Sequence, residues 1–249
     1  LPYQNFSDDD LAHRVLYVEA SRGCPFKCEF CLSSLDKTAW AFDLQPFLNE
    51  LDILYKRGAR NFKFVDRTFN LKIESSVQIL QFFLDRIDSD GSDNLLVHFE
   101  VIPDHLPDRL KIIISKFPPG VLQFEVGIQS FNEEVQKLIS RRQDNAQTES
   151  NLRWLIQQSN AHLHTDLIFG LPGESRQEMM DQVHVLNQLP MDNIKFHQLQ
   201  IIAKTHMAVE YRKHPENFEL FGMEEYIDFM VRFLEQLNPK FVVERFAGE

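Results

Sequence analysis

The sequence predicts an α/β fold in which parallel strands are joined by crossover helices. Short β-branched or apolar runs alternate with amphipathic stretches along all 249 residues, and no hairpin signal joins neighbouring runs. No linker, internal repeat or low-complexity tract divides the chain, so we expect one domain over residues 1–249. Six strand–helix units fit either a six-unit partial barrel or an open doubly wound sheet, and the pattern alone leaves both open.

The strands are predicted from runs of four to seven residues that are rich in β-branched, aromatic and other apolar side chains. The last of these runs is short and is a candidate seventh strand. In chain order the runs are Val15–Glu19, Phe62–Val65, Leu96–Val101, Leu122–Gly127, Leu163–Phe169, Ile194–Leu199 and Phe241–Glu244.

The helices are predicted where apolar residues recur at i, i+3, i+4 and i+7. The first contains Phe47, Leu51 and Leu54 and is closed by Gly58, which suits a helix C-terminus. The second contains Val77, Leu80, Phe83, Leu84 and Ile87. The later ones cover Leu110–Phe117, Val135–Ile156 with a break near Gln143–Gln147, Met179–Leu186 and Tyr226–Leu237.

Composition and charge narrow the classes of function. The chain is 43% apolar and 25% charged, as in an ordinary soluble globular protein, and it has no apolar run long enough to span a membrane. A net charge of −11 without a cluster of Lys and Arg counts against a nucleic-acid partner. The N-terminus has no initiator Met and no signal-peptide core. We expect a chain cut from a longer cytoplasmic protein.

The only three cysteines stand together as Cys24-x3-Cys28-x2-Cys31, directly after the first predicted strand. Three thiolates on one short loop can hold three irons of a cubane cluster and leave the fourth iron open, whereas an electron-carrier cluster is closed by four cysteines. An open iron can bind a small molecule. We expect the three sulfurs to converge at the mouth of the fold.

Other uses of these cysteines fit the sequence less well. A structural zinc site needs four N or S ligands, and here there is no second cysteine pair and no histidine within ten residues after Cys31. An odd number of closely spaced cysteines also counts against a disulfide framework. The pattern therefore favours an iron–sulfur site.

Polar residues also mark the C-terminal ends of the other strands, which is the edge where parallel α/β folds bind ligands. They are Asp66–Thr68, Glu100, Gly127–Ser130, Asp166 and the turn Gly170–Glu174. A turn or a helix cap would explain any one of them, but five on one rim indicate a site. His197, on the sixth strand, could face the barrel interior or fill the core.

The cysteine triad, with Phe30 directly before its last member, resembles the radical S-adenosylmethionine (SAM) superfamily. The resemblance implies a parallel (β/α)6 partial TIM barrel over nearly the whole chain. It also implies a [4Fe–4S] cluster on Cys24, Cys28 and Cys31, with SAM on the open iron. Reductive cleavage of SAM then gives a 5′-deoxyadenosyl radical that abstracts hydrogen from an unknown substrate. Such a cluster would be sensitive to oxygen.

Different segments of the chain resemble two different branches of the superfamily. Val126–Asn132, Leu138–Arg141 and Thr165–Gly173 are similar to the oxygen-independent coproporphyrinogen oxidase branch. Tyr17–Cys24 and Phe64–Asn70 are similar to radical SAM proteins that carry an N-terminal cobalamin-binding domain. That domain would lie upstream of residue 1, so cobalamin is expected only through a domain outside this chain.

Carried over by position, the resemblance implies a set of SAM contacts. Glu100 would accept hydrogen bonds from the ribose hydroxyls, Gln129 and Asp166 would complete the ribose and methionine contacts, and Arg141 would pair with the carboxylate. Arg142 would project away around a helix. The full set is Phe30, Asp66, Thr68, Glu100, Gln129, Arg141, Asp166, Ile168 and Leu199.

The remaining members of this set have two tasks. Phe30, Ile168 and Leu199 would face adenine, and main-chain groups around Asp66–Thr68 would receive the SAM ammonium. Asp66–Thr68 stands where the superfamily usually has Gly-Gly-Glu, and Lys204-Thr205 stands where relatives often have Gly-Thr.

Two other functions stay open. One is a non-catalytic iron–sulfur or metal-binding module that has kept the fold, and the other is a haem-binding, chaperone-like relative. The rim residues favour an enzyme, because a mere cluster holder would not need them. Its reaction could be of oxidoreductase or methyltransferase type. The expected partners are a small-molecule substrate and an electron donor such as flavodoxin or ferredoxin.

Overall fold

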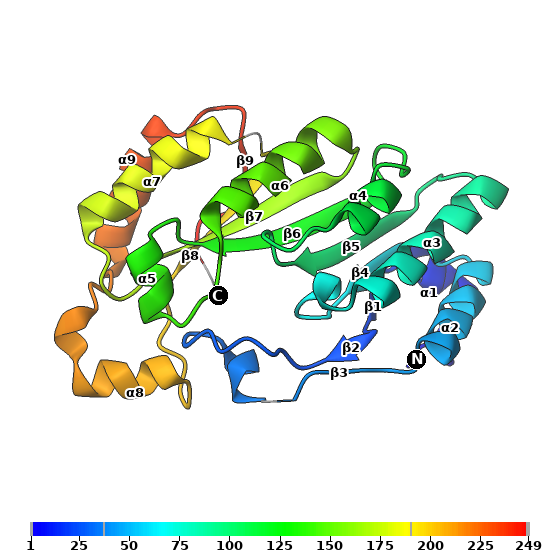
Figure 1. Cartoon of the computed structure of the whole chain (residues 1–249), viewed down its shortest axis with the longest axis horizontal. Coiled ribbons are helices and arrows are strands. Elements are labelled where there is room, and N and C mark those ends of the chain that lie inside the picture. Colours follow the sequence, from blue (N-terminus) through cyan, green and yellow to red (C-terminus); the bar gives the residue numbers. More distant parts are fainter. Residues whose placement is uncertain (1, 37, 190, 248–249) are drawn as a thin grey trace.

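The computed structural model describes residues 2–36, 38–189 and 191–247. Within them, seven parallel strands form one sheet in the order β1-β4-β5-β6-β7-β8-β9, which crosses the centre of Figure 1. The strands are β1 (Leu16–Val18), β4 (Asn61–Phe64), β5 (Leu96–Val101), β6 (Leu122–Gln129), β7 (His162–Phe169), β8 (Asn193–Gln198) and β9 (Val242–Arg245).

The strand order decides between the two architectures that the sequence left open. Each strand of the sheet pairs in parallel with the next one along the chain. The order therefore never reverses, as it would at the switch point of a doubly wound sheet. Among the described residues β1 and β9 are the two free edges, so the barrel is partial. The predicted partial barrel is confirmed, and its seventh strand is β9.

Most of the helices follow the predicted segments, whereas α1 and α8 were not predicted. Figure 1 shows α3, α4 and α6 lying along one face of the sheet. The helices are α1 (Asp8–His13), α2 (Leu44–Lys56), α3 (Ile73–Asp90), α4 (Asp108–Ile114), α5 (Glu133–Leu138), α6 (Asn145–Gln158), α7 (Arg176–Gln188), α8 (His206–Lys213) and α9 (Met223–Gln236). None of the described helices is long and apolar enough to cross a membrane.

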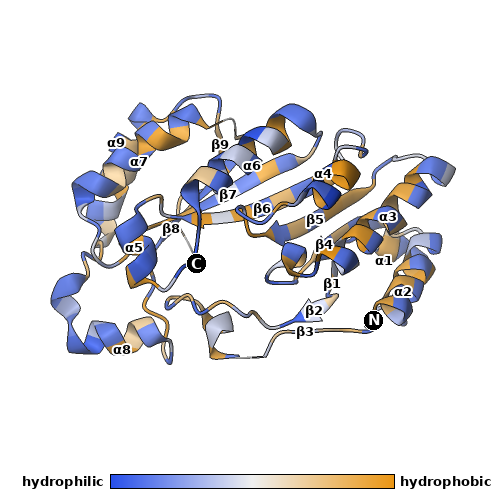
Figure 2. Cartoon of the chain, viewed as in Figure 1, coloured by the Kyte–Doolittle hydropathy of each residue, from blue (hydrophilic) through white to orange (hydrophobic). Residues whose placement is uncertain are grey.

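The core lies between the helices and the outer face of the sheet. Figure 2 shows that the helices have one hydrophobic and one hydrophilic side. Phe64 and Phe99, on neighbouring strands, are fully buried with ring centroids 4.5 Å apart, and Phe69 stacks on Phe99 at 3.9 Å. Burying each such ring stabilises the fold by about 1.5–3 kcal/mol.

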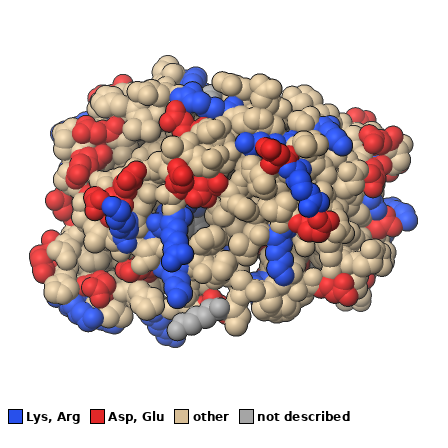
Figure 3. Space-filling view, viewed as in Figure 1, with Lys and Arg blue, Asp and Glu red and all other residues tan. Residues whose placement is uncertain are grey.

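The sequence missed a short antiparallel hairpin of β2 (Ser21–Arg22) and β3 (Trp40–Ala41). Its strands have two residues each, which is too few for a periodic pattern to be visible. On the face shown in Figure 3, acidic and basic side chains are interspersed. This agrees with the lack of a basic cluster in the sequence.

Candidate active site

The cysteine loop leaves the sheet at the C-terminal end of β1 and is closed at its base by the β2–β3 hairpin. Gly23 follows β2 with a φ of +84°, and a Cβ there would lie 1.8 Å from the carbonyl oxygen of Thr38. Only glycine lets the two sides of the cysteine loop, at Gly23 and Thr38, come this close together. Figure 1 shows the loop reaching from the hairpin towards α5 and α8.

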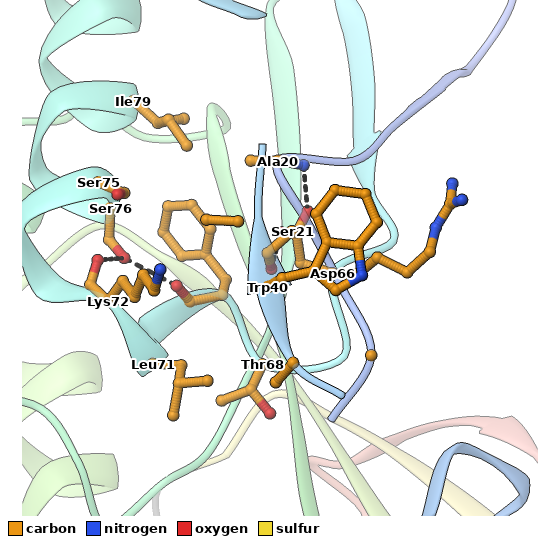
Figure 4. Close-up of a pocket in the computed structure, with 15 residues that line it drawn as sticks. Ala20, Ser21, Trp40, Asp66, Thr68, Leu71, Lys72, Ser75, Ser76 and Ile79 are labelled. Carbon is orange, nitrogen blue, oxygen red and sulfur yellow. Dashed lines mark hydrogen bonds between the residues drawn. The ribbon is translucent and has the colours of Figure 1, made fainter. Parts of the chain in front are cut away.

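Asp66 anchors this hairpin. Its side chain is 2% exposed and accepts hydrogen bonds from the Ala20 amide (2.9 Å) and the Ser21 hydroxyl (2.5 Å). Figure 4 shows the carboxylate turned towards Ala20 and Ser21, in a small cavity beside Trp40. Burial raises the pKa of Asp66, and the two hydrogen bonds oppose that rise. The Asp66 side chain is therefore committed to the loop base, and a ligand in the cysteine cavity meets other groups of this segment, including Arg67 and Thr68.

The three thiols are free, half-buried and line a single cavity of about 190 Å³. Burial raises the pKa of Cys24 and of Cys28, and the charge of Arg141 opposes the rise at Cys28. The Cys31 amide donates to the Cys28 carbonyl (3.1 Å), which closes a tight turn between them.

All three cysteines line this one cavity, and the convergence of their sulfurs on one point stays a prediction. Among the described residues, no group of three or more His, Cys, Asp or Glu side chains is arranged to hold a single metal ion. Thiolates of a cubane bind three different irons, so they stand further apart than the ligands of one ion. Three soft thiolates around one cavity fit such a cluster.

The structure brings eight of the nine expected SAM contacts into two adjoining cavities. The cavity of the cysteines is also lined by Phe30, Thr68, Glu100, Gln129, Arg141 and Asp166. A second cavity, of about 300 Å³, shares Phe30, Gln129 and Asp166 with the first and adds Ile168 and Leu199. The three residues expected to face adenine thus line one space. The exception is Asp66, which lines neither cavity.

Glu100 and Glu125 are register partners on β5 and β6 and both line the first cavity. Burial raises the pKa of Glu100, and the charge of Glu125 adds to the rise. Burial also acts to raise the pKa of Glu125, but Oε2 of Glu125 lies 2.9 Å from His98 Nε2, 3.1 Å from Lys195 Nζ and 3.6 Å from Lys63 Nζ. These three bases together hold the pKa of Glu125 well below its usual range.

Sequence reasoning missed Glu125, although a signal for it was present. Along β6, buried and half-buried residues alternate without interruption. The half-buried positions are Gln123, Glu125, Gly127 and Gln129. This period of two places the side chains of Gln123 and Glu125 on the inner face of the sheet, so Glu125 could have been found from the alternation along β6.

Gln129 reaches the cavities because the end of β6 is irregular. The register with β7 shifts between Gly127 and Gln129, and Gln129 has a φ of +70°. Bulges of this kind re-aim side chains near binding sites, and a left-handed residue other than glycine costs about 1–2 kcal/mol. A Cβ at Gly127 would lie 2.5 Å from the side-chain nitrogen Nε2 of Gln129. Glycine therefore leaves the space that this side chain uses.

Arg141 lies in a loop, where the sequence predicted a helix. Residues 139–144 are not helical, and the Arg141 guanidinium donates to the Gly127 carbonyl and, at 2.9 Å, to Gln143 Oε1. Arg142 lines the same cavity. The expectation that Arg142 projects away around a helix is therefore wrong.

His197 faces the interior of the partial barrel. It lines the second cavity, and its Nε2 lies 3.6 Å from Asp166 Oδ1. The sequence left open whether His197 faces the barrel interior or fills the core, and in the structure it faces the cavity.

Comparisons with known proteins agree with this geometry. A family model for the radical SAM superfamily matches residues 18–186, which is more than half of the chain. A model for a radical SAM C-terminal domain matches residues 191–249. The uncharacterized protein YtqA of Bacillus subtilis is 28% identical over 149 residues, which is 59% of this chain and 45% of that protein. The chain spans about half the length of the curated relatives it matches.

Solved structures share the fold. The radical SAM methyltransferase TsrM from Kitasatospora setae, with tryptophan and a SAM analog bound, superposes with a TM-score of 0.70 at 17% identity, over 82% of this chain and 40% of TsrM. Coproporphyrinogen III oxidase (HemN) from Escherichia coli has a TM-score of 0.64 at 17% identity, over 89% of this chain and 51% of HemN.

Proposed function

Because the chain belongs to the radical SAM superfamily, we propose that it is the catalytic core of a radical SAM enzyme. One observation supports this most: three free cysteines face the same cavity as polar residues from the ends of four strands. The cofactors of the family are a [4Fe–4S] cluster and SAM. When bound, the reduced cluster would supply one electron to SAM, whose S–C5′ bond would break to give methionine and a 5′-deoxyadenosyl radical that abstracts hydrogen from the substrate.

The proposed cluster ligands are Cys24, Cys28 and Cys31, which leave one iron for SAM. Arg141 lies beside Cys28 and is suited to the SAM carboxylate, because a planar guanidinium can grip two oxygens at once. The main chain around Asp66–Thr68 is proposed to accept hydrogen bonds from the SAM ammonium.

The carboxylates of the cavity have different tasks in this proposal. Glu100 is proposed to accept hydrogen bonds from the ribose hydroxyls of SAM. Gln129 and Asp166 complete the ribose and methionine contacts. Glu125, held ionised by its three bases, acts only as an acceptor at the cavity floor.

The second cavity is proposed to hold adenine. Phe30, Ile168 and Leu199 supply apolar surface for the two faces of the base. Because Gln129 and Asp166 line both cavities, the ribose would sit where the two spaces join.

We propose a small-molecule substrate and an electron donor such as flavodoxin or ferredoxin. Three exposed bases surround the cysteine cavity on a chain whose net charge is −11. They are Lys27, inside the cysteine loop, and Arg67 and Arg142, which line the cavity. An acidic carrier would complement them, which speeds association at low salt.

The domain organisation, the cellular location and the role of cobalamin are also proposals. One continuous sheet runs from β1 to β9 across the boundary between the two family models, which supports a single domain over residues 1–249. We place the protein in the cytoplasm, where thiols stay reduced. Cobalamin, which is bound in a TsrM structure, would reach this site only through a domain outside this chain.

Anaerobic reconstitution with iron and sulfide, followed by dithionite and SAM, tests the proposal. The expected product is 5′-deoxyadenosine, formed by the wild type and lost in a variant with Cys24, Cys28 and Cys31 all changed to alanine. A cluster that assembles without any SAM cleavage would instead indicate the non-catalytic iron–sulfur module. Binding of haem in place of a cluster would indicate the chaperone-like relative.

A further inference from the structure

We propose that Glu29 and Ser140 form a clamp that couples the cysteine loop to Arg141 and strengthens the mutual dependence of cluster and SAM binding beyond what SAM on the open iron already gives. This inference rests on the proposed function, because it takes the cysteines as cluster ligands and Arg141 as the SAM-carboxylate residue. Neither Glu29 nor Ser140 lines the two cavities, so the pair would act only through the residues it positions.

Glu29 lies between Cys28 and Cys31 and is held from two sides. Its amide donates to the Ile139 carbonyl (3.0 Å), and its carboxylate Oε1 accepts from the Ser140 hydroxyl (2.9 Å). Its own carbonyl accepts from the Met207 amide (3.2 Å). The cysteine loop is thereby tied to the end of α5 and to the start of α8, and both main-chain groups of Glu29 are used.

Ser140 connects this contact to Arg141 through an unusual backbone. It has a φ of +53°, in the left-handed region that favours glycine. This turn ends α5 and returns the next amide, that of Arg141, to the Gln136 carbonyl (2.8 Å). The guanidinium is thereby directed to the Gly127 carbonyl. Glycine would suit this backbone better, but only a residue with a donor can reach Glu29.

The consequence is a mechanical link between two binding residues. Cys28 precedes Glu29 directly and Arg141 follows Ser140 directly, so the Glu29–Ser140 hydrogen bond, with the main-chain bond from Glu29 to Ile139, limits how far the two segments can move apart. A ligand that orders one end removes part of the ordering cost at the other end. Coupling of this kind is reciprocal: whatever factor SAM adds to cluster retention, the cluster adds to SAM affinity.

The test is the rate of cluster loss to a chelator, with and without SAM. Reconstituted wild type and variants are mixed anaerobically with EDTA, and the visible absorbance of the cluster is followed. The ratio of the two rates measures the protection that SAM gives. We expect Ser140→Gly and Glu29→Ala each to reduce the wild-type ratio by about fivefold, which is the lower end of coupling between sites.

The variants separate a hydrogen bond from backbone strain. Ser140→Gly relieves the left-handed backbone, so a loss of protection in it cannot come from strain. Ser140→Asn tolerates the same backbone and restores a donor, so it should keep most of the protection. Lys137→Ala, on the exposed side of α5, is the matched control and should match the wild type.

Two outcomes would overturn the inference, and they can be told apart. If SAM protects the wild-type cluster and protects Ser140→Gly and Glu29→Ala equally well, the clamp is wrong and the proposed function stands. If the wild type assembles no cluster, or SAM gives it no protection, the proposed function fails and the clamp fails with it.

Discussion

Changing Glu174 to glutamine should make the stability of the chain less dependent on pH. Glu174 is 2% exposed, and Ser130 Oγ (3.0 Å) and Gln182 Nε2 (2.8 Å) both donate to its Oε1. Its Oε2 has no hydrogen-bond partner among the described residues. Burial therefore raises the pKa of Glu174 to about 7, against the lowering effect of the Ser130 hydrogen bond and with a small rise from Glu178.

A raised pKa means that the folded state keeps a proton which the unfolded chain releases at lower pH. The contribution of Glu174 to stability is therefore complete below the ordinary value of 4.5 and is lost as the pH rises through about 7. Linkage over this range makes the loss about 2–3 kcal/mol between about pH 5 and about pH 8. Glutamine has nearly the same shape and cannot ionise, so this part of the pH dependence should disappear.

Urea unfolding of the cluster-free protein under reducing conditions, at several pH values, measures the effect. Histidines and other groups titrate in both proteins, so the difference in unfolding free energy between variant and wild type isolates Glu174. Glu235→Gln, on the exposed side of α9, is the matched control. Parallel stability curves for wild type and Glu174→Gln would refute the reasoning, because a carboxyl with an ordinary pKa would be ionised throughout this range.

Three further results are expected. Arg141→Lys should weaken SAM binding by about tenfold through loss of the two-point contact while cluster absorbance stays unchanged; in a SAM titration with Lys137→Ala as control, equal affinities would exclude the carboxylate role. Gly127→Ala should lower SAM affinity, because its Cβ would lie 2.5 Å from the Gln129 amide nitrogen and displace that side chain; unchanged binding in the same titration would mean that Gln129 does not contact SAM. Phe99→Ala should cost about 3–5 kcal/mol in urea unfolding, and a cost below about 1 kcal/mol would show that the core refills the space.

The sheet was predictable from the sequence because each strand buries one face under helices. β5 has the predicted bounds, Leu96–Val101, and the other strands differ by one or two residues at their ends. The gap between α5 and α6 was harder to place. Leu138 and Ile139 continue the helical period, and the chain then turns at a serine with positive φ, where sequence reasoning looks for glycine.

The site was predictable in its location and less so in its detail. Strand ends identified the rim, and eight of the nine expected SAM contacts line the two cavities. Asp66 shows the limit, because a carboxylate after a strand looks the same whether it meets a ligand or anchors a hairpin. The hairpin that decides the matter has two residues per strand and leaves no periodic signal.

Charged residues on the inner face of the sheet influence the site, in addition to the residues at its rim. Lys63, Glu125, Lys195 and Glu244 lie on four different strands and form a chain of ion pairs. The attraction within a buried ion pair often does not exceed the cost of removing both charges from water. Apolar residues of the same size would often stabilise a fold equally well. The value of these ion pairs lies in the charge that they hold on Glu125, which in turn raises the pKa of Glu100 at the cavity. The outer face thus supplies stability, while the inner face supplies the charges that act on the carboxylates of the cavity. A register slip of one residue would exchange the two faces and abolish both.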